Sequence, residues 1–262
     1  MSLSQAAGRL LLVGCGNMAG AMLTRWLAAG LDPAQVTAVS PSGRPMPDGV
    51  RSLPAIPDTP FDTILLALKP QQISQVRDAL AGHRPARLIS ILAGVEVATL
   101  RGLTGATAVV RAMPNLPVAF GKGVVALHGD ADPAVEALMA PLGLVEWIAD
   151  EALFDVVTAL AGSGPGFLAR YVDAMAAAGA ALGLPKDQAA RLALAAIEGS
   201  AAWIAADGAS PAALAERVAS PGGSTRAGLN VLDRDDALVR LLTETLRAAT
   251  IRNAEMAAAA RS

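Results

Sequence analysis

The sequence predicts an α/β domain followed by an all-α domain, and three observations support this division. Up to about residue 150, short apolar runs alternate with helical patterns, as in a parallel sheet with helical crossovers. A glycine-rich turn separates the first apolar run from the first helical stretch. After Asp150 the strand-like runs stop, and long Ala- and Leu-rich stretches follow. We therefore expect two domains, at residues 1–150 and 151–262.

Each element is expected from its apolar pattern and its bounding turn residues. Strands are predicted at residues 9–13, 36–39, 63–68, 88–91, 108–110, 123–127 and 145–148. Helices are predicted after the glycine turn through Leu27 and at residues 73–80, 133–142, 153–160, 167–182, 186–206 and 238–259. Gly183 followed by Pro185 predicts that one helix ends there and the next begins.

The composition permits a sizeable core and argues against several classes of partner. Of the 262 residues, 53% are hydrophobic, and the net charge is -2. This charge disfavours nucleic acid or an anionic membrane as the main partner. The apolar stretch over 156–184 is interrupted by Arg170 and Asp173, so we expect a buried helix and no membrane span. The first apolar run is too short for a secretory signal, which predicts a cytoplasmic protein.

Few residues are available for a disulfide or a metal site. The single cysteine, Cys15, excludes an internal disulfide, and we expect it to be a small filler residue. His83 and His128 are far apart in predicted loops, so two solvated histidines and no metal centre are expected. Asp150 and Glu151 stand where the helical domain begins, and helix capping is their expected role.

The glycine-rich turn matches the dinucleotide fingerprint G-x-G-x-x-G/A in its required setting. Gly14 would allow the tight turn, Gly16 would let the backbone approach a pyrophosphate, and Ala19 would let helix and strand pack closely. Backbone N–H groups of Asn17 and Met18 then begin the helix and face the phosphates. The motif favours a Rossmann-type domain over an ordinary glycine turn.

The end of the second predicted strand bears on the choice of cofactor. NAD-binding proteins usually have an acid there, whereas this chain has Ser40, Ser42 and Arg44. Hydroxyls and a guanidinium would bind a 2′-phosphate that an acid would repel. We expect NADPH, with NADH as the alternative if Arg44 is only a solvated loop charge.

Several segments together resemble one enzyme family. The stretch Ser220-Pro221-Gly222-Gly223-Ser224-Thr225 is similar to the signature that pyrroline-5-carboxylate reductases carry ahead of a helix. Four other segments of this chain also resemble motifs of the family, at residues 14–19, 66–71, 90–95 and 111–115. Two departures are Ala161-Gly162-Ser163-Gly164-Pro165-Gly166-Phe167, where the family often has Ser-Gly-Ser-Gly-Pro-Ala-Tyr, and Ser40-Pro41-Ser42, where it often has an Asn-Arg-type pair.

The resemblance implies a Rossmann-type domain, a helical dimerisation domain and an interlocked homodimer. It implies NADPH-dependent reduction of the cyclic imine of 1-pyrroline-5-carboxylate to L-proline. By position, it implies that the cofactor lies along Ala67, Lys69 and Pro70, with the nicotinamide near Met113, Pro114 and Asn115. The substrate would then bind at Ser220, Gly222, Gly223, Ser224 and Thr225, with the Thr225 hydroxyl at the imine nitrogen.

The residues of the segment 220–225 suit an anionic substrate. Glycines expose backbone N–H groups, three hydroxyls add donors, and a helix start favours a carboxylate. A plain N-cap is the alternative structural role for Ser or Thr here.

Three other functions compete with this assignment. A hydroxy-acid dehydrogenase of similar architecture would need an acid–base lysine early in the helical domain, and residues 167–182 contain none. A non-catalytic dinucleotide sensor would not need the 220–225 segment. Reduction of a six-membered cyclic imine stays open.

Overall fold

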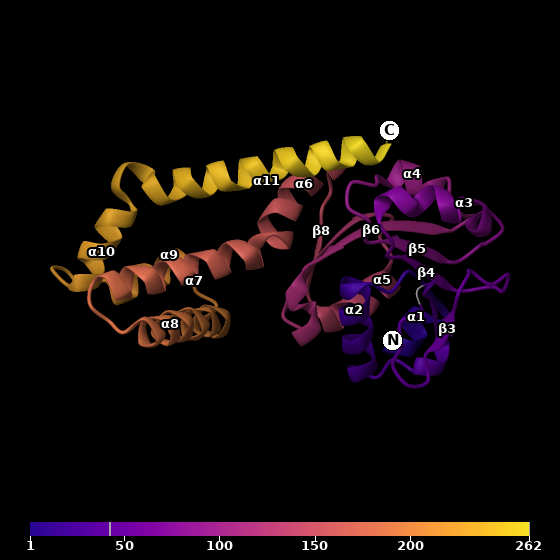
Figure 1. The fold of residues 1–262 in the computed structure, drawn as a ribbon, viewed down its shortest axis with the longest axis horizontal. Coiled ribbons are helices and arrows are strands. Elements are labelled where there is room, and N and C mark those ends of the chain that lie inside the picture. The colour runs from indigo at the N-terminus through magenta and orange to yellow at the C-terminus, as the bar shows by residue number, and fades with distance from the viewer. Residues whose placement is uncertain (42, 262) are drawn as a thin grey trace. The chain divides into compact units, whose positions relative to one another are not determined.

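The computed structural model describes residues 1–41 and 43–261 (Figure 1). The chain forms two compact units, Met1–Ser163 together with Ala249–Ser262, and Gly164–Ala248. The change in composition at Asp150 therefore does not coincide with the boundary between the compact units.

The first unit is built on an eight-stranded sheet in the order β3-β2-β1-β4-β5-β6-β7-β8. All neighbouring strands are parallel except β6 and β7, which are antiparallel. The strands are β1 Leu10–Val13, β2 Val36–Val39, β3 Arg51–Leu53, β4 Thr63–Leu66, β5 Arg87–Ser90, β6 Ala108–Pro114, β7 Gly123–Gly129 and β8 Gly143–Trp147. Because β1 lies between β2 and β4, the loops that follow these three strands meet at one edge of the sheet.

The seven predicted strands are present, and β3 is an additional one. Every residue of β1, β2 and β4 is buried, which explains their continuous apolar runs. β3 has only three residues, two of them exposed, so it left no apolar pattern to detect.

Helices cover both faces of the sheet in the first unit. They are α1 Leu3–Ala7, α2 Asn17–Ala28, α3 Ile73–Ala81, α4 Val97–Arg101, α5 Pro133–Met139 and α6 Phe154–Val157. Side chains of β1 alternate between two cores, with Leu10 and Leu12 in one and Leu11 and Val13 in the other.

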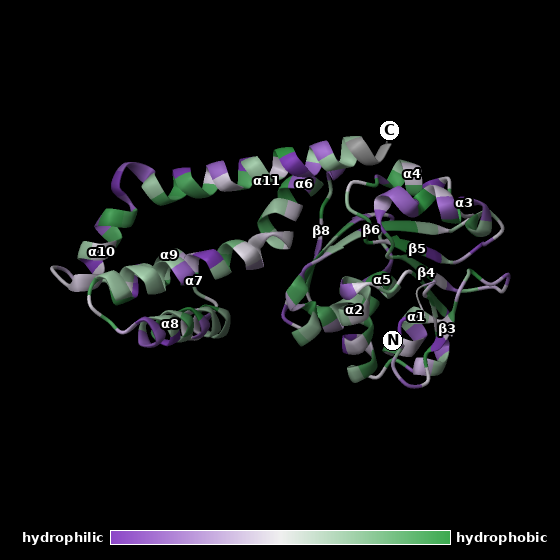
Figure 2. Ribbon diagram, in the orientation of Figure 1, coloured by the Kyte–Doolittle hydropathy of each residue, from purple (hydrophilic) through white to green (hydrophobic). Residues whose placement is uncertain are grey.

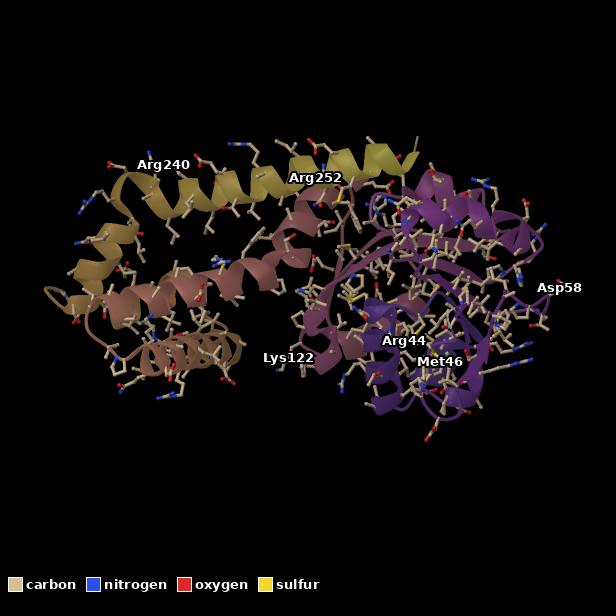
Figure 3. The ribbon with its side chains drawn as sticks, viewed as in Figure 1. Arg44, Met46, Asp58, Lys122, Arg240 and Arg252 are labelled. Carbon is tan, nitrogen blue, oxygen red and sulfur yellow. The ribbon has the colours of Figure 1, made fainter. Side chains whose placement is uncertain are left out.

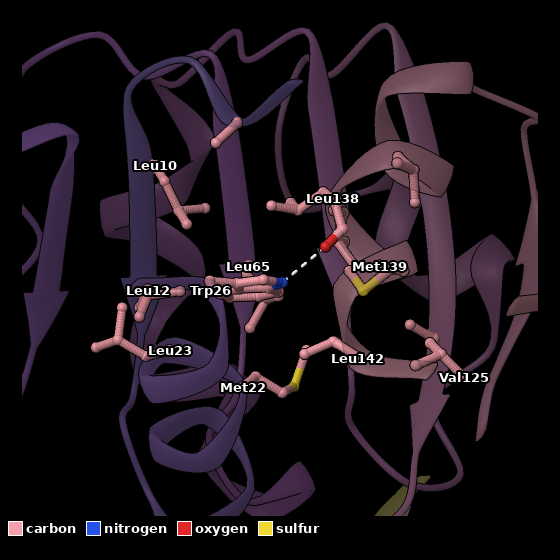
Figure 4. Packing of buried hydrophobic residues seen from close by; sticks show 14 of the residues in the cluster. Leu10, Leu12, Met22, Leu23, Trp26, Leu65, Val125, Leu138, Met139 and Leu142 are labelled. Atoms are coloured by element: carbon pink, nitrogen blue, oxygen red, sulfur yellow. Dashed lines mark hydrogen bonds between the residues drawn. The ribbon is translucent and has the colours of Figure 1, made fainter. Parts of the chain in front are cut away.

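The buried side chain of Trp26 fixes α2 against the sheet (Figure 4). Its indole N–H donates to the backbone carbonyl of Leu138 at 2.7 Å. Leu10 and Leu12 of β1 belong to the same core. This packing places the amino-terminal end of α2, and hence the glycine turn, at the sheet edge where β1 ends.

The second unit is entirely helical. It contains α7 Gly164–Ala181, α8 Lys186–Asp207, α9 Pro211–Val218, α10 Ser224–Leu232 and the first half of α11 Ala237–Arg261. Helices α7 and α8 approach closely because small residues meet: a Cβ on Gly179 would lie 3.6 Å from the Cβ of Ala189. The eight-residue helix α9, capped by Ser210, is not among the predicted elements.

Much of the apolar surface of α7 and α8 is exposed in the single chain, and Figure 2 shows hydrophobic residues along much of both helices. Leu168 of α7 is 50% exposed and Leu194 of α8 is 58% exposed. The stretches Glu151–Ala181 and Lys186–Asp207 are long and apolar enough to cross a membrane by length and composition alone, and only 11% of the most apolar part of each is buried. The expectation of a buried helix over 156–184 is thus wrong for an isolated chain.

The prediction of two solvated histidines is also wrong. His83 is 7% exposed and its ring lies near that of Phe61. His128 is in β7, with Nδ1 2.8 Å from the carbonyl oxygen of Ile148. Among the described residues, no group of three or more His, Cys, Asp or Glu side chains is placed to hold a metal.

Of the two expected caps, only Asp150 caps the turn that it begins, by accepting the N–H of Ala152 at 2.9 Å. Glu151 instead accepts the N–H of Val97 at 3.0 Å and pairs with Arg111 at 3.2 Å. The Arg111 guanidinium also lies over the ring of Phe154. Glu151 therefore connects three segments of the first unit, and its expected role as a cap was wrong.

Candidate active site

The glycine turn has the geometry that its motif predicts. Gly14 has φ of +89°, and a Cβ there would lie 2.8 Å from the carbonyl oxygen of Ala67. Gly16 is the N-cap of α2, with no side-chain cap, and a Cβ there would meet nothing within 4 Å. Ala19 is buried against the sheet. The turn thus requires glycine at Gly14 and leaves open space beside Gly16, where the motif brings a pyrophosphate.

A cavity of about 460 Å³ runs along this turn. The loops after β1, β2 and β4 line it, together with one residue after β5. Its expected members are Gly14, Gly16, Asn17, Met18, Ala19, Ala67 and Lys69. Sequence reasoning missed Gln72, Gln75, Val76 and Ile91. The spacing of the first three, at i, i+3 and i+4, would have placed them on one helix face.

The loop after β4 is held by its own side chains. The backbone N–H of Lys69 donates to Oε1 of Gln72 at 3.0 Å. Pro70 opens the short 3-10 turn Pro70–Gln72 and does not itself line the cavity. Pro70 therefore shapes the wall, while Lys69 contributes to it.

The loop after β2 brings Arg44 to the glycine turn. Its guanidinium lies 3.5 Å from the carbonyl oxygen of Cys15, and its backbone N–H donates to the hydroxyl of Ser40 at 3.2 Å. Arg44 and Met46, labelled in Figure 3, line a second cavity of about 490 Å³ that shares Cys15 and Asn17 with the first. Ser40 is buried and stabilises the turn, and Ser42 lies outside the described residues.

Burial raises the pKa of the Cys15 thiol, and the nearby Arg44 opposes this shift. A thiol held protonated is a poor nucleophile. The structure therefore agrees with Cys15 as a small filler in the turn.

The charges around both cavities fit a nucleotide cofactor. None of the described residues lining either cavity is acidic, and Arg44 and Lys69 are cationic. Phosphates would meet backbone N–H groups at the start of α2 and these two cations. The residues present are thus suited to hold a dinucleotide at the glycine turn.

At the end of β6, Met113 and Asn115 contact the segment that leads into α7. A Cβ on Gly162 would lie 3.1 Å from Cε of Met113. Asn115 is 6% exposed, and its amide bonds to the backbone at both ends. Its side chain is therefore engaged within the domain.

In the second unit, the segment 220–225 forms a turn that opens α10. Gly223 is the N-cap and no side chain caps the helix. Gly222 has φ of +74°, and a Cβ on Gly223 would lie 2.6 Å from Oγ of Ser220. Ser220, Ser224 and Thr225 are all exposed in the single chain. The three hydroxyls are thus gathered at a helix start that glycine, and neither Ser nor Thr, caps.

Comparison with known proteins places this geometry in one family. The family model described as pyrroline-5-carboxylate reductase dimerisation matches residues 151–256. Pyrroline-5-carboxylate reductase of Pseudomonas aeruginosa is 34% identical over 95% of this chain and 97% of its own length. That of Synechocystis is 34% identical over 94% of this chain and 97% of its own length.

Solved structures agree in fold. The Coxiella burnetii pyrroline-5-carboxylate reductase has a TM-score of 0.82 and 29% identity, covering 94% of this chain and 97% of that one. The Plasmodium falciparum pyrroline carboxylate reductase, solved with NADP bound, has a TM-score of 0.75 and 22% identity, covering 95% of this chain and 98% of that one. The chain belongs to the pyrroline-5-carboxylate reductase family.

Proposed function

We propose that this chain reduces the cyclic imine of 1-pyrroline-5-carboxylate to L-proline with NADPH, the last step of proline biosynthesis. The observation that carries the proposal is the glycine-capped helix start at residues 220–225. It occurs in a chain that also has a nucleotide-sized cavity along a dinucleotide turn. Family membership over nearly the whole length supports the same reaction.

The proposed roles follow from what the reaction needs. Reduction of an imine requires a hydride at carbon, which a bound nicotinamide supplies, and a proton at nitrogen. The substrate carboxylate would accept hydrogen bonds from the N–H groups of Gly222 and Gly223 and from the hydroxyls of Ser220 and Ser224. The positive end of the α10 dipole favours the same anion. Thr225 would donate to the imine nitrogen and orient the ring.

The cofactor preference is proposed from the loop after β2. Arg44 is the cation of this loop that faces the glycine turn, and no carboxylate lines the adjoining cavities within the described chain. A 2′-phosphate would gain a charge-assisted bond there, whereas a 2′-hydroxyl would gain little. Proposed cofactor contacts are Gly14, Gly16, Asn17, Met18, Ala19, Ser40, Ser42, Arg44, Ala67, Lys69 and Met113. Pro70 and Asn115 are proposed to lie beside the cofactor and to shape the segments that contact it.

The proposed assembly is a cytoplasmic homodimer with a small imino-acid substrate. The matched family model is a dimerisation domain, and the apolar surface of α7 and α8 needs a cover. A larger assembly of such dimers is the alternative. Neither nucleic acid nor membrane is proposed as a partner.

The reaction is tested by following NADPH oxidation with 1-pyrroline-5-carboxylate beside its six-membered homologue and its regioisomer with the carboxylate at carbon 2. We expect the highest kcat/KM with 1-pyrroline-5-carboxylate and L-proline as product. A higher kcat/KM with the six-membered ring would reassign the substrate. No oxidation with any imine, while NADPH still binds, would favour a non-catalytic sensor.

A further inference from the structure

We propose that Asn115 is a positioning residue for this reduction. In this role it holds the π-helical turn Thr158–Gly162 against the ends of β6 and β7, and thereby fixes Met113. The inference rests on the proposed function, because the family resemblance is what places Met113 near the nicotinamide. All the contacts that carry it lie within the first compact unit.

Asn115 follows β6 directly and connects it to three other elements through hydrogen bonds. Its Nδ2 donates to the carbonyl of Ala161 at 2.9 Å, and its Oδ1 accepts the N–H of Val124 at 2.9 Å. Its backbone N–H donates to the carbonyl of Val124, and its own carbonyl accepts the N–H of Val118. One residue thus joins β6, β7, the 3-10 turn Leu116–Phe120 and the π-helical turn.

The surroundings of the Asn115 amide allow little movement. The residue is 6% exposed, so a lost hydrogen bond would not be replaced readily by water. A Cβ on Gly123 would lie 2.9 Å from Oδ1 of Asn115 and 2.4 Å from Cγ1 of Val118. Only glycine therefore permits this close approach, and the amide is held in one orientation.

The π-helical turn makes the second half of the connection. Its i to i+5 pattern includes the bond from the N–H of Ser163 to the carbonyl of Thr158 at 3.0 Å. Such turns are rare, occur mostly as single turns inside α-helices, and are frequent at functional sites. Gly162 of this turn packs on the thioether of Met113, with a Cβ position 3.1 Å from Cε. A shift of the turn would therefore be passed directly to Met113.

This arrangement predicts an effect on turnover that is separate from nucleotide affinity. A small misplacement of a group beside the reacting carbon slows the chemical step, because hydride transfer depends on geometry. The glycine turn that would hold the pyrophosphate makes no hydrogen bond to Asn115 in the described structure. NADPH binding should consequently be affected much less than kcat.

The test uses Asn115→Asp in the full-length protein. This change keeps an oxygen for the Val124 N–H but replaces the donor to Ala161 with an oxygen that repels its carbonyl. We expect kcat to fall by about tenfold to a hundredfold, with a nearly unchanged Kd for NADPH measured by fluorescence titration. When the pH is lowered, the new carboxyl can take up a proton and donate to Ala161, so kcat relative to wild type should recover.

A second readout needs neither cofactor nor turnover. In hydrogen–deuterium exchange of the cofactor-free protein, the segment 158–163 should exchange faster in Asn115→Asp than in wild type. The matched control is Asp132→Ala, which removes the α5 cap and the ion pair with Arg87 elsewhere in the same unit. The control should lower Tm but leave kcat and exchange at 158–163 unchanged. If Asn115→Asp does not fold, Asn115→Ser replaces it.

Three results would overturn the inference. Normal kcat despite faster exchange would make Asn115 a structural residue only. A Kd for NADPH that weakens by the same factor as kcat/KM would make it a direct cofactor contact. If segment 158–163 exchanges faster in Asn115→Asp but the wild-type protein reduces no imine, the proposed function is wrong. Asn115 then has no role in reduction. The exchange measurement therefore distinguishes the two failures.

Discussion

Thr225 lies in the first turn of α10 but does not cap it, because Gly223 occupies the N-cap position. The helix therefore does not need this hydroxyl, which favours its proposed role at the imine nitrogen. Thr225→Ala should lower turnover substantially, while Thr225→Ser, which keeps a hydroxyl, should retain much of it. Steady-state kinetics and thermal unfolding on the same samples check this.

Ser220→Ala is the companion variant, since its proposed partner is the carboxylate in both ground and transition states. It should mainly raise KM and change kcat little. If Thr225→Ala instead has normal turnover and a lower Tm, the hydroxyl contributes to the fold alone.

Arg44 tests the cofactor preference at the same scale. Arg44→Ala should weaken NADPH more than NADH, by about tenfold to a hundredfold, because a charge-assisted bond to the 2′-phosphate is lost. Binding titrations with both nucleotides measure the ratio. Arg51→Ala is the control, since Arg51 pairs with Thr37 near the start of β2, at the opposite end from Arg44. Equal losses for the two nucleotides would remove Arg44 from the 2′-phosphate.

Individual residues differed in how well the sequence predicted their surroundings. The glycine turn could be predicted because its constraints arise at Gly14 itself, which has a positive φ and lies close to the backbone of Ala67. The bonds of Asn115 and Glu151 could not, because their partners lie 46 and 54 residues away along the chain. Only the folded chain brings the π-helical turn to Asn115, and α4 and β6 to Glu151.

At the scale of elements, burial on both faces decided which strands were predictable. β1, β2 and β4 are fully buried and apolar throughout, whereas β3 is a short exposed edge strand. β6 and β7 run longer than predicted because their antiparallel pairing pairs Pro114 with Val125 and Val110 with Gly129. That extension places His128 in a strand, where a loop was expected.

The connection between Glu151 and β6 should be important for the stability of the first unit. Glu151→Ala would leave the guanidinium of Arg111 buried without its carboxylate and the N–H of Val97 without its acceptor. We expect the free energy of unfolding to fall by about 3 kcal/mol. This is the lower end of the range for breaking a buried ion pair, because the Glu151 side chain is 26% exposed. Urea unfolding measures the change.

Arg101→Ala provides the matched comparison within the same unit. Arg101 pairs with Asp130 at 2.7 Å, but the two side chains are 50% and 36% exposed. Loss of this ion pair should lower the free energy of unfolding by less than about 1 kcal/mol, as for other surface pairs. Equal losses for the two variants would show that the burial of Arg111 adds nothing to its pairing.

At the scale of the whole molecule, the change in composition at Asp150 and the boundary of the compact units reflect different properties. The first depends on local sequence and the second on packing. Composition marks where strands cease, and the family model begins there, at residue 151. The first compact unit continues to Ser163 and also includes the end of α11 from residue 249, because those segments pack on the sheet domain. Packing of sequence-distant segments leaves no local signal in the chain.

The exposed apolar residues of the second unit lead to the prediction about assembly. Helices that are apolar over much of their circumference must be covered, and one chain leaves Leu192 of α8 54% exposed and Leu194 58% exposed. Leu194→Arg should therefore convert a dimer into a monomer and lower specific activity as the protein is diluted. Leu144→Arg is the control, since Leu144 is 61% exposed on β8 of the first unit, outside the dimerisation model. Light scattering together with activity across a dilution series measures both, and a fully active wild-type monomer would overturn the dimer.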